Sequence, residues 1–188
     1  MRAMGLRFTT APAHVDEEAL DTGNPSEDAI IVARAKAERV ALRRPKSLII
    51  GADTMVVLDG RVLGKPASRG EAREFLKALS GRAHDVMTGL CLIHRAEGAR
   101  ADSVVITKVV FRRIAPHEIE AYLDTPDPYD KAGAYGIQSG GGAFVDHIEG
   151  DYFNVVGLPL ERLRDMLAEF LDVSGLILPP APPGIQRR

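Results

Sequence analysis

Three side chains suited to phosphate chemistry lie close together in the stretch from residue 48 to residue 66. An apolar run ends at Asp53 and Thr54, and a predicted hairpin then returns the chain to Lys65. A carboxylate at the end of a buried strand is costly to desolvate unless a metal, a cation or a water molecule uses it. Lys65 stands between a glycine and a proline, and a lysine in such a stiff turn can serve as a phosphate cation. The segment therefore indicates a site that handles phosphate, with Asp53 as its first candidate.

Each of these residues also has a plainer interpretation. Asp53 could cap a turn, and Thr54 could be an ordinary β-branched strand residue instead of a donor to a substrate carbonyl. Two further cations, Arg34 and Lys36, carry less weight because helix surfaces hold such residues routinely. An acidic cluster at residues 16–18 could bind a hard cation such as Mg²⁺, although acidic loops are usually just solvated.

A glycine-rich segment over residues 130–142 offers backbone amides that can approach a phosphate or a base. Lys131 and Gln138 are expected to point into the same place. The segment contains no GxxxxGK[ST] motif and no GxGxxG motif that opens a helix, so neither a P-loop nor a Rossmann site is predicted. The amide of Gln138 both donates and accepts hydrogen bonds, so it could read the edge of a nucleobase.

The composition is that of an ordinary globular protein. With 188 residues, 45% of them hydrophobic, the chain can bury the core of one domain built as two lobes. The net charge of -2 gives no positive field for a nucleic-acid polymer. No apolar stretch approaches the ~18 residues of a membrane span, and the N-terminus does not resemble a signal peptide. We therefore expect a cytoplasmic protein that binds neither nucleic-acid polymers nor membranes.

Several other chemistries have little support in the sequence. The single cysteine, Cys91, excludes an internal disulfide and reads as a buried core thiol. The five histidines are scattered and form no HExxH or comparable pair, so a zinc site is not expected. No serine lies in a GxSxG elbow, which argues against hydrolysis through a covalent serine.

The elements that must position the candidates alternate between helix and strand. Asn24 and Pro25 mark the start of a helix that ends near Leu42, and Asp59-Gly60 is the favoured chemistry for a two-residue hairpin turn. The expected strands cover residues 48–52, 54–58, 61–63, 85–93, 104–112 and 143–145, and the other expected helices cover 68–79, 116–123 and 158–171. The pattern predicts an α/β protein with a mixed sheet, one domain over residues 1–173 and a proline-rich, disordered tail over 174–188.

Five blocks of this sequence resemble the Maf family of nucleoside triphosphate pyrophosphatases. The resemblance covers about residues 5 to 171, and the blocks are GADTMVVLDG, GKP, LSGR, DKAGAYGIQ and EGDYFNVVGLPL. It implies a fold like that of Maf and inosine triphosphatase: an elongated mixed sheet with flanking helices, in two lobes around a central cleft that takes the nucleotide. It also implies a homodimer.

The resemblance implies a reaction as well. Family members cleave the bond between the α and β phosphates with a divalent cation, Mg²⁺ or Mn²⁺, and release pyrophosphate. Asp53 would accept the proton of the attacking water and would help Glu17 hold the metal. Thr54 and Gln138 fall at the positions that set base choice, and ADT with GIQ there resembles the branch that acts on dTTP and UTP. Modified pyrimidine nucleotides are further candidate substrates.

Three lysines match family lysines that contact phosphates: Lys36 in ARAKAE, Lys65 in GKP and Lys131 in DKAG. A triphosphate carries several negative charges, so cations must offset the charge that develops on the leaving pyrophosphate. The sequence departs from the family pattern at Ser139, where glycine commonly follows GIQ.

A larger departure concerns the N-terminus, where members normally begin with a strand and a phosphate-binding SxSPRR segment. This sequence has no such segment, so we expect an open sheet edge and weaker phosphate binding. We favour a start that is recorded too late. The alternative function is a catalytically impaired nucleotide-binding protein or a cell-division regulator, and a third possibility is an unstable product without function.

Overall fold

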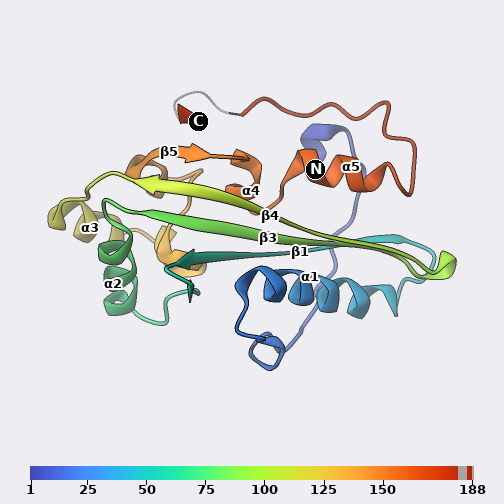
Figure 1. Ribbon diagram of the computed structural model, residues 1–188, viewed down its shortest axis with the longest axis horizontal. Coiled ribbons are helices and arrows are strands. Elements are labelled where there is room, and N and C mark those ends of the chain that lie inside the picture. The colour runs from blue at the N-terminus through green and yellow to red at the C-terminus, as the bar shows by residue number, and fades with distance from the viewer. Residues whose placement is uncertain (182–185, 188) are drawn as a thin grey trace. The chain divides into compact units, whose positions relative to one another are not determined.

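The computed structural model describes residues 1–181 and 186–187 (Figure 1). The helices are α1 (Pro25–Ala41), α2 (Arg69–Leu79), α3 (Pro116–Leu123), α4 (Tyr152–Val156) and α5 (Leu160–Leu167). The strands are β1 (Leu48–Leu58), β2 (Arg61–Leu63), β3 (Ala83–His94), β4 (Ala99–Phe111), β5 (Val145–Glu149) and β6 (Gln186–Arg187). No helix in the described part of the chain is long and apolar enough to cross a membrane.

The strands form one mixed sheet in the order β2-β1-β3-β4-β5-β6. β2 pairs with β1 and β5 pairs with β4 in antiparallel fashion, whereas β6 runs parallel to β5. The predicted α/β class with a mixed sheet is therefore confirmed. The tail predicted for residues 174–188 lies partly outside the described residues, at 182–185 and 188.

The chain divides into two compact units, which matches the expectation of two lobes. Unit 1 comprises Met1–Asp53, Thr88–Val105 and Gly157–Ala181. Unit 2 comprises Thr54–Met87 and Ile106–Val156 together with the described residues Gln186–Arg187. The strands β1, β3 and β4 each contribute residues to both units.

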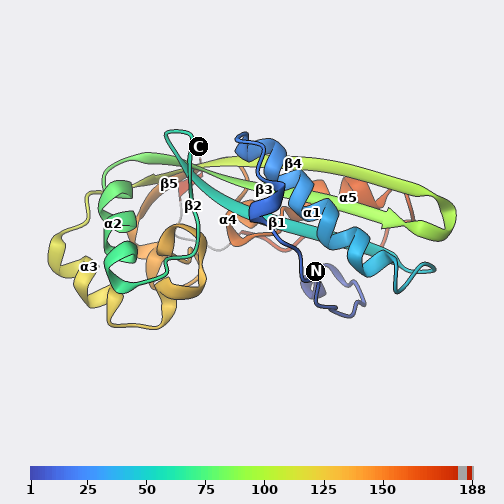
Figure 2. The same cartoon turned by 90° about the horizontal axis from the view of Figure 1, so that it is seen from below.

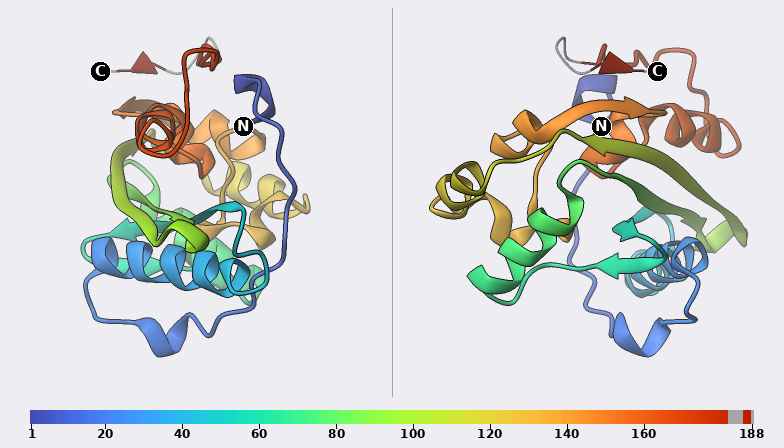
Figure 3. Two further views of the ribbon diagram at one scale, coloured as in Figure 1. Left: turned by 90° about the vertical axis from the view of Figure 1, so that its right-hand side faces the viewer. Right: turned by 60° about the vertical axis from the view of Figure 1, so that its left-hand side comes forward.

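In unit 1 the strand residues are covered by a helix on each face (Figure 3, left). Alternate residues of a strand point to opposite faces, and β1 follows this rule. Ile49 packs with the alanines of α1, whereas Leu48 and Ile50 pack with Leu163 and Leu167 of α5. Cys91 is buried in the α1 cluster, as predicted.

Two glycines let α1 approach the strands of unit 1 very closely (Figure 2). A Cβ atom on Gly51 would lie 2.2 Å from the carbonyl oxygen of Ala33, and one on Gly89 would lie 2.0 Å from that of Ala29. Both distances are far inside van der Waals contact, so any side chain at these positions would push α1 away. The contact fixes the height of α1 above β1.

Local sequence signals set several element boundaries as expected. The Asn24 side chain accepts a hydrogen bond from the Ser26 amide and caps α1, and Ser68 caps α2 through the Glu71 amide. The β1–β2 hairpin turns at Asp59 and Gly60, which both have positive φ values, 51° and 79°. These angles are those of the favoured two-residue hairpin turn.

Four predictions of element boundaries are wrong. The strands expected at 48–52 and 54–58 form one continuous strand, β1, so Asp53 lies within a strand and not at its end. Residues Gly140–Phe144 form a 3₁₀ turn and the strand begins only at Val145, so the strand expected at 143–145 is misplaced. The last helix ends at Leu167, and Leu171 is 40% exposed instead of lying on its apolar side. β4 begins at Ala99 instead of residue 104, because the chain turns tightly just before it.

Candidate active site

The Lys36 side chain joins two of the predicted carboxylates in unit 1. Its Nζ atom lies 2.6 Å from Oδ1 of Asp53 and 2.7 Å from Oε1 of Glu17. The Asp53 side chain is only 12% exposed, whereas Glu17 is largely in solvent. The structure therefore brings together the predicted proton acceptor, a predicted phosphate cation and the predicted metal ligand.

The elements of unit 1 explain this meeting. Gly51 and Asp53 are two residues apart on β1, so they lie on the same face of the strand. Gly51 contacts Ala33 and Ala37 of α1, and Lys36 directly precedes Ala37. The close approach of α1 at Gly51 thus brings the Lys36 side chain within reach of the Asp53 carboxylate.

The electrostatics of the group favour a charged lysine. Burial by itself would lower the pKa of Lys36, but the hydrogen bonds to Asp53 and Glu17 outweigh it, and the pKa is raised. Lys36 therefore stays protonated at neutral pH. A protonated lysine at this distance supplies the cation that a largely buried carboxylate such as Asp53 needs.

A metal ion would have to share these carboxylates with Lys36. Among the described residues no group of three or more His, Cys, Asp or Glu side chains could hold a metal. Glu17 and Asp53 nevertheless converge on one cation. Mg²⁺ is commonly bound by one or two carboxylates together with substrate phosphates and water. The donor set therefore fits Mg²⁺ when the substrate supplies further oxygens.

The other predicted substrate contacts belong to unit 2. Thr54 follows Asp53 on β1, and successive strand residues direct their side chains to opposite faces. Lys65 is exposed and makes no ion pair with any residue that the structure describes. The carbonyl of Gly64 accepts a hydrogen bond of 3.1 Å from the Gly133 amide, so the Lys65 turn is tied to the glycine-rich loop.

The glycine-rich loop is held in one conformation by close contacts. Gly133 has a φ of 68°, and a Cβ atom there would lie 2.8 Å from the Val56 side chain. Lys131 pairs with Asp130 at 2.7 Å and with Asp127 at 3.1 Å. Gln138, by contrast, is exposed, directly after the buried Ile137. Gln138 is therefore exposed to solvent on a loop whose neighbouring residues are held in place by close contacts.

Sequence reasoning missed a residue of this loop region, Asp127. The Ser139 hydroxyl donates to its carboxylate, with the hydroxyl oxygen 2.7 Å from Oδ1 and 2.6 Å from Oδ2, and the Tyr122 hydroxyl donates to Oδ2 at 2.6 Å. The only signal in the sequence was Ser139, which stands where the family commonly has glycine. Burial tends to raise the pKa of Asp127, but Ser139, Tyr122 and Lys131 lower it overall, so the carboxylate is ionised.

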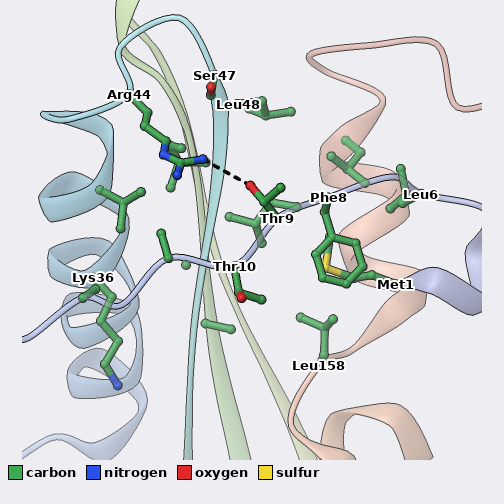
Figure 4. Close-up of a pocket in the computed structure, with 18 of the residues that line it drawn as sticks. Met1, Leu6, Phe8, Thr9, Thr10, Lys36, Arg44, Ser47, Leu48 and Leu158 are labelled. Carbon is green, nitrogen blue, oxygen red and sulfur yellow. Dashed lines mark hydrogen bonds between the residues drawn. The ribbon is translucent and has the colours of Figure 1, made fainter.

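A pocket of about 810 Å³ lies in unit 1, along residues Ser47–Ala52 (Figure 4). The N-terminal segment forms another wall, where the Thr9 hydroxyl accepts a hydrogen bond of 3.2 Å from Arg44. Among the described residues β2 pairs with β1 only at Val56–Leu58, so the part of β1 in unit 1 has an open edge on that side.

A mixed α/β fold that pairs a largely buried carboxylate with a lysine, and that also carries a glycine-rich loop, offers groups suited to phosphate chemistry. The chain belongs to the Maf family, since residues 1–170 match the family described as Maf-like protein.

Curated relatives support this assignment over most of the chain. A protein of Moorella thermoacetica is 46% identical over 175 residues, which cover 93% of this chain and 90% of the relative. One of Thermococcus onnurineus is 49% identical over 162 residues, which cover 85% and 86%. One of Clostridioides difficile is 43% identical over 169 residues, which cover 90% and 87%. All three relatives are named dTTP/UTP pyrophosphatase.

Proposed function

We propose that this protein hydrolyses dTTP and UTP to the nucleoside monophosphate and pyrophosphate. The names of the relatives support this choice of substrates. The observation that carries it is the Asp53 carboxylate, which is largely buried and lies 2.6 Å from the Lys36 ammonium. A carboxylate kept ionised by a neighbouring cation can accept a proton at neutral pH.

The chemistry assigns a role to each member of the group. Asp53 takes a proton from the attacking water while the water oxygen forms a bond to the α phosphorus. The bond between the α and β phosphates then breaks, and pyrophosphate leaves. Lys36 offsets negative charge on the phosphates as it develops, which is where fixed cations stabilise a transition state most.

A divalent cation, Mg²⁺ or Mn²⁺, belongs to this proposal. Glu17 and Asp53 would hold it, because both carboxylates converge on one cation. The ion would supply positive charge that polarises the phosphate oxygens.

In unit 2, Gln138 and Thr54 are proposed to contact the base, and Lys65 and Lys131 to contact phosphates. The exposure of the Gln138 and Lys65 side chains supports these roles. Lys131 would exchange one of its carboxylate partners for a phosphate.

The protein is further proposed to work as a homodimer in the cytoplasm, where nucleoside triphosphates are made and used. Sedimentation velocity should give a mass twice that of one chain, and cell fractionation should recover the protein with the soluble fraction. A monomer across the micromolar range would contradict the dimer.

The test of catalysis is the variant Asp53→Asn. It removes the proton acceptor and nearly preserves the shape of the side chain, so release of pyrophosphate from dTTP and UTP with Mg²⁺ should fall by a factor of about 10³ or more. Asp59→Asn is a matched control, since Asp59 lies at the hairpin turn with a φ of 51° that asparagine also tolerates.

Full activity of Asp53→Asn would contradict the assigned role. Binding of dTTP without any release of pyrophosphate by the unmodified chain would favour the alternative of a nucleotide-binding regulator.

A further inference from the structure

The turn that carries Gln138 is anchored at both ends to one carboxylate. The amide of Ser139 donates to the carbonyl of Gly136 at 3.2 Å, which closes a four-residue turn with Gln138 at its third position. At the end of the turn, the Ser139 hydroxyl donates to Asp127. At its start, the Gly136 amide donates to the Tyr122 hydroxyl at 3.3 Å, and that hydroxyl donates to Asp127.

The Asp127 and Tyr122 side of the anchor is largely buried, whereas Ser139 is exposed. The Asp127 side chain is 16% exposed, and Tyr122 is buried with its ring packed edge-on against Phe144. Gly140 lies close to the Tyr122 ring, because a Cβ atom there would be 3.0 Å from it. Hydrogen bonds to an ionised group are among the stronger ones in a protein, and the bond from Tyr122 is also partly buried.

A fixed turn matters because a glutamine amide is ambiguous. It can donate to the 4-oxo group of uracil or thymine, and it can equally accept from the 4-amino group of cytosine. Selectivity arises only where the amide is held at a position that suits one base edge and leaves the other unsatisfied. A mobile Gln138 would tolerate both bases.

We propose that Asp127 is a positioning residue for base selection, which acts on Gln138 through Ser139 and Tyr122 and favours 4-oxo pyrimidines over cytosine. This inference rests on the role proposed above for Gln138. Asp127 also contacts Lys131, but a phosphate contact is common to all nucleotides and cannot change the preference among bases.

The experiment compares kcat/KM for UTP and CTP in the full chain with Mg²⁺. Asp127→Asn and Ser139→Ala should each lower the preference for UTP over CTP, by about tenfold for Asp127→Asn, the size of one lost hydrogen bond to a charged group. The loss should appear mainly in KM for UTP, with kcat changed little. Asp124→Asn is the matched control, because Asp124 is exposed and pairs with Arg69 instead of with Ser139 or Tyr122.

A double-variant cycle separates positioning from a merely structural role. Gln138→Ala should itself lower the preference, and Asp127→Asn should have no further effect on the preference in that background. If Asp127 had only a structural role, Asp127→Asn would instead lower the activity toward both nucleotides equally, and it would lower the activity of Gln138→Ala further. Ser139→Ala removes one exposed hydroxyl and keeps the test available if Asp127→Asn does not fold.

Each failure has its own meaning. If Gln138→Ala lowers the preference while Asp127→Asn and Ser139→Ala leave it unchanged, the positioning role is wrong and the proposed function stands. If Gln138→Ala leaves the preference unchanged, the base contact proposed for Gln138 is wrong and the positioning role is overturned with it. If the unmodified chain hydrolyses neither nucleotide, the proposed function itself fails.

Discussion

At the scale of single residues, Lys36 is central to the candidate active site, because it pairs with both of its carboxylates. It is the one side chain seen in contact with both Asp53 and Glu17 among the described residues, and its charge compensates both carboxylates. The same ammonium stands where a divalent cation would have to bind. Under the proposed function, Lys36 would therefore have two opposed effects, since it would bind the phosphates and compete with the metal.

Replacing this lysine should separate the two effects. Lys36→Gln should lower kcat/KM for dTTP by about 10- to 100-fold, as expected for the loss of a charge-assisted hydrogen bond. It should also tighten Mg²⁺ binding in the absence of nucleotide, measured by isothermal titration calorimetry, because the competing ammonium is gone. Lys46→Gln, at an exposed position, is the control, and unchanged Mg²⁺ affinity in Lys36→Gln would contradict the competition.

A second residue-scale prediction concerns stability in acid. His84 is buried against Tyr135 and Phe111, and burial lowers its pKa from 6.5 to about 3. The unfolded chain binds a proton at His84 below pH 6.5 and the folded chain does not, so stability should fall as the pH drops from about 6.5 toward 3. At about 1.4 kcal/mol per pKa unit, the loss should reach a few kcal/mol.

Chemical denaturation at several pH values measures this dependence. His84→Gln should flatten the curve between pH 6.5 and 4, whereas His14→Gln, at an exposed position, should not. Parallel curves for His84→Gln and the unmodified chain would show that His84 does not cause the acid sensitivity.

At the scale of elements, the distance between α1 and β1 decides whether the carboxylate and the lysine meet. Gly51 sets that distance, because its missing side chain leaves room for the Ala33 carbonyl and the Ala37 methyl group. The helix and strand are each predictable from local patterns, but their separation depends on this one contact.

Gly51→Ala should therefore weaken both the fold and the site. The added methyl group would overlap the Ala33 carbonyl, so the free energy of unfolding should fall by about 3 kcal/mol, and kcat/KM should fall as Lys36 moves away from Asp53. Gly70→Ala is the control, since its nearest neighbour would be 3.7 Å away and alanine favours the helix. Normal stability and activity of Gly51→Ala would contradict the argument.

At the scale of the whole molecule, ligand binding should be visible as stability. A ligand that binds only the folded chain stabilises it by about 2.7 kcal/mol at 100 times its Kd. A non-hydrolysable UTP analogue with Mg²⁺ should therefore raise the Tm by about 5–10 °C for a chain of this size.

Variants distinguish binding from catalysis in this measurement. Asp53→Asn should keep most of the rise in Tm although it releases no pyrophosphate, whereas Lys36→Gln should lose much of it because a phosphate contact is missing. Equal shifts for the UTP analogue and for a matched cytidine analogue would show binding without base selection.

The sequence by itself determined the α/β class, most element boundaries and the turn between β1 and β2. These features depend on residues close together in the chain, such as the Asn24 cap and the pair Asp59-Gly60. Local patterns failed where packing decided the backbone, as at Gly140–Phe144, which read as the approach to a strand and forms a 3₁₀ turn.

Only the tertiary structure decided which candidates meet. Glu17, Lys36 and Asp53 are far apart in the chain, and nothing in their spacing shows that one ammonium contacts both carboxylates. In the same way, the sequence shows Asp127 only as part of a rigid proline loop, and the structure shows that the Ser139 hydroxyl donates a hydrogen bond to it. Such contacts depend on differences of a few tenths of an ångström in the spacing of packed elements, and a sequence pattern does not contain that information.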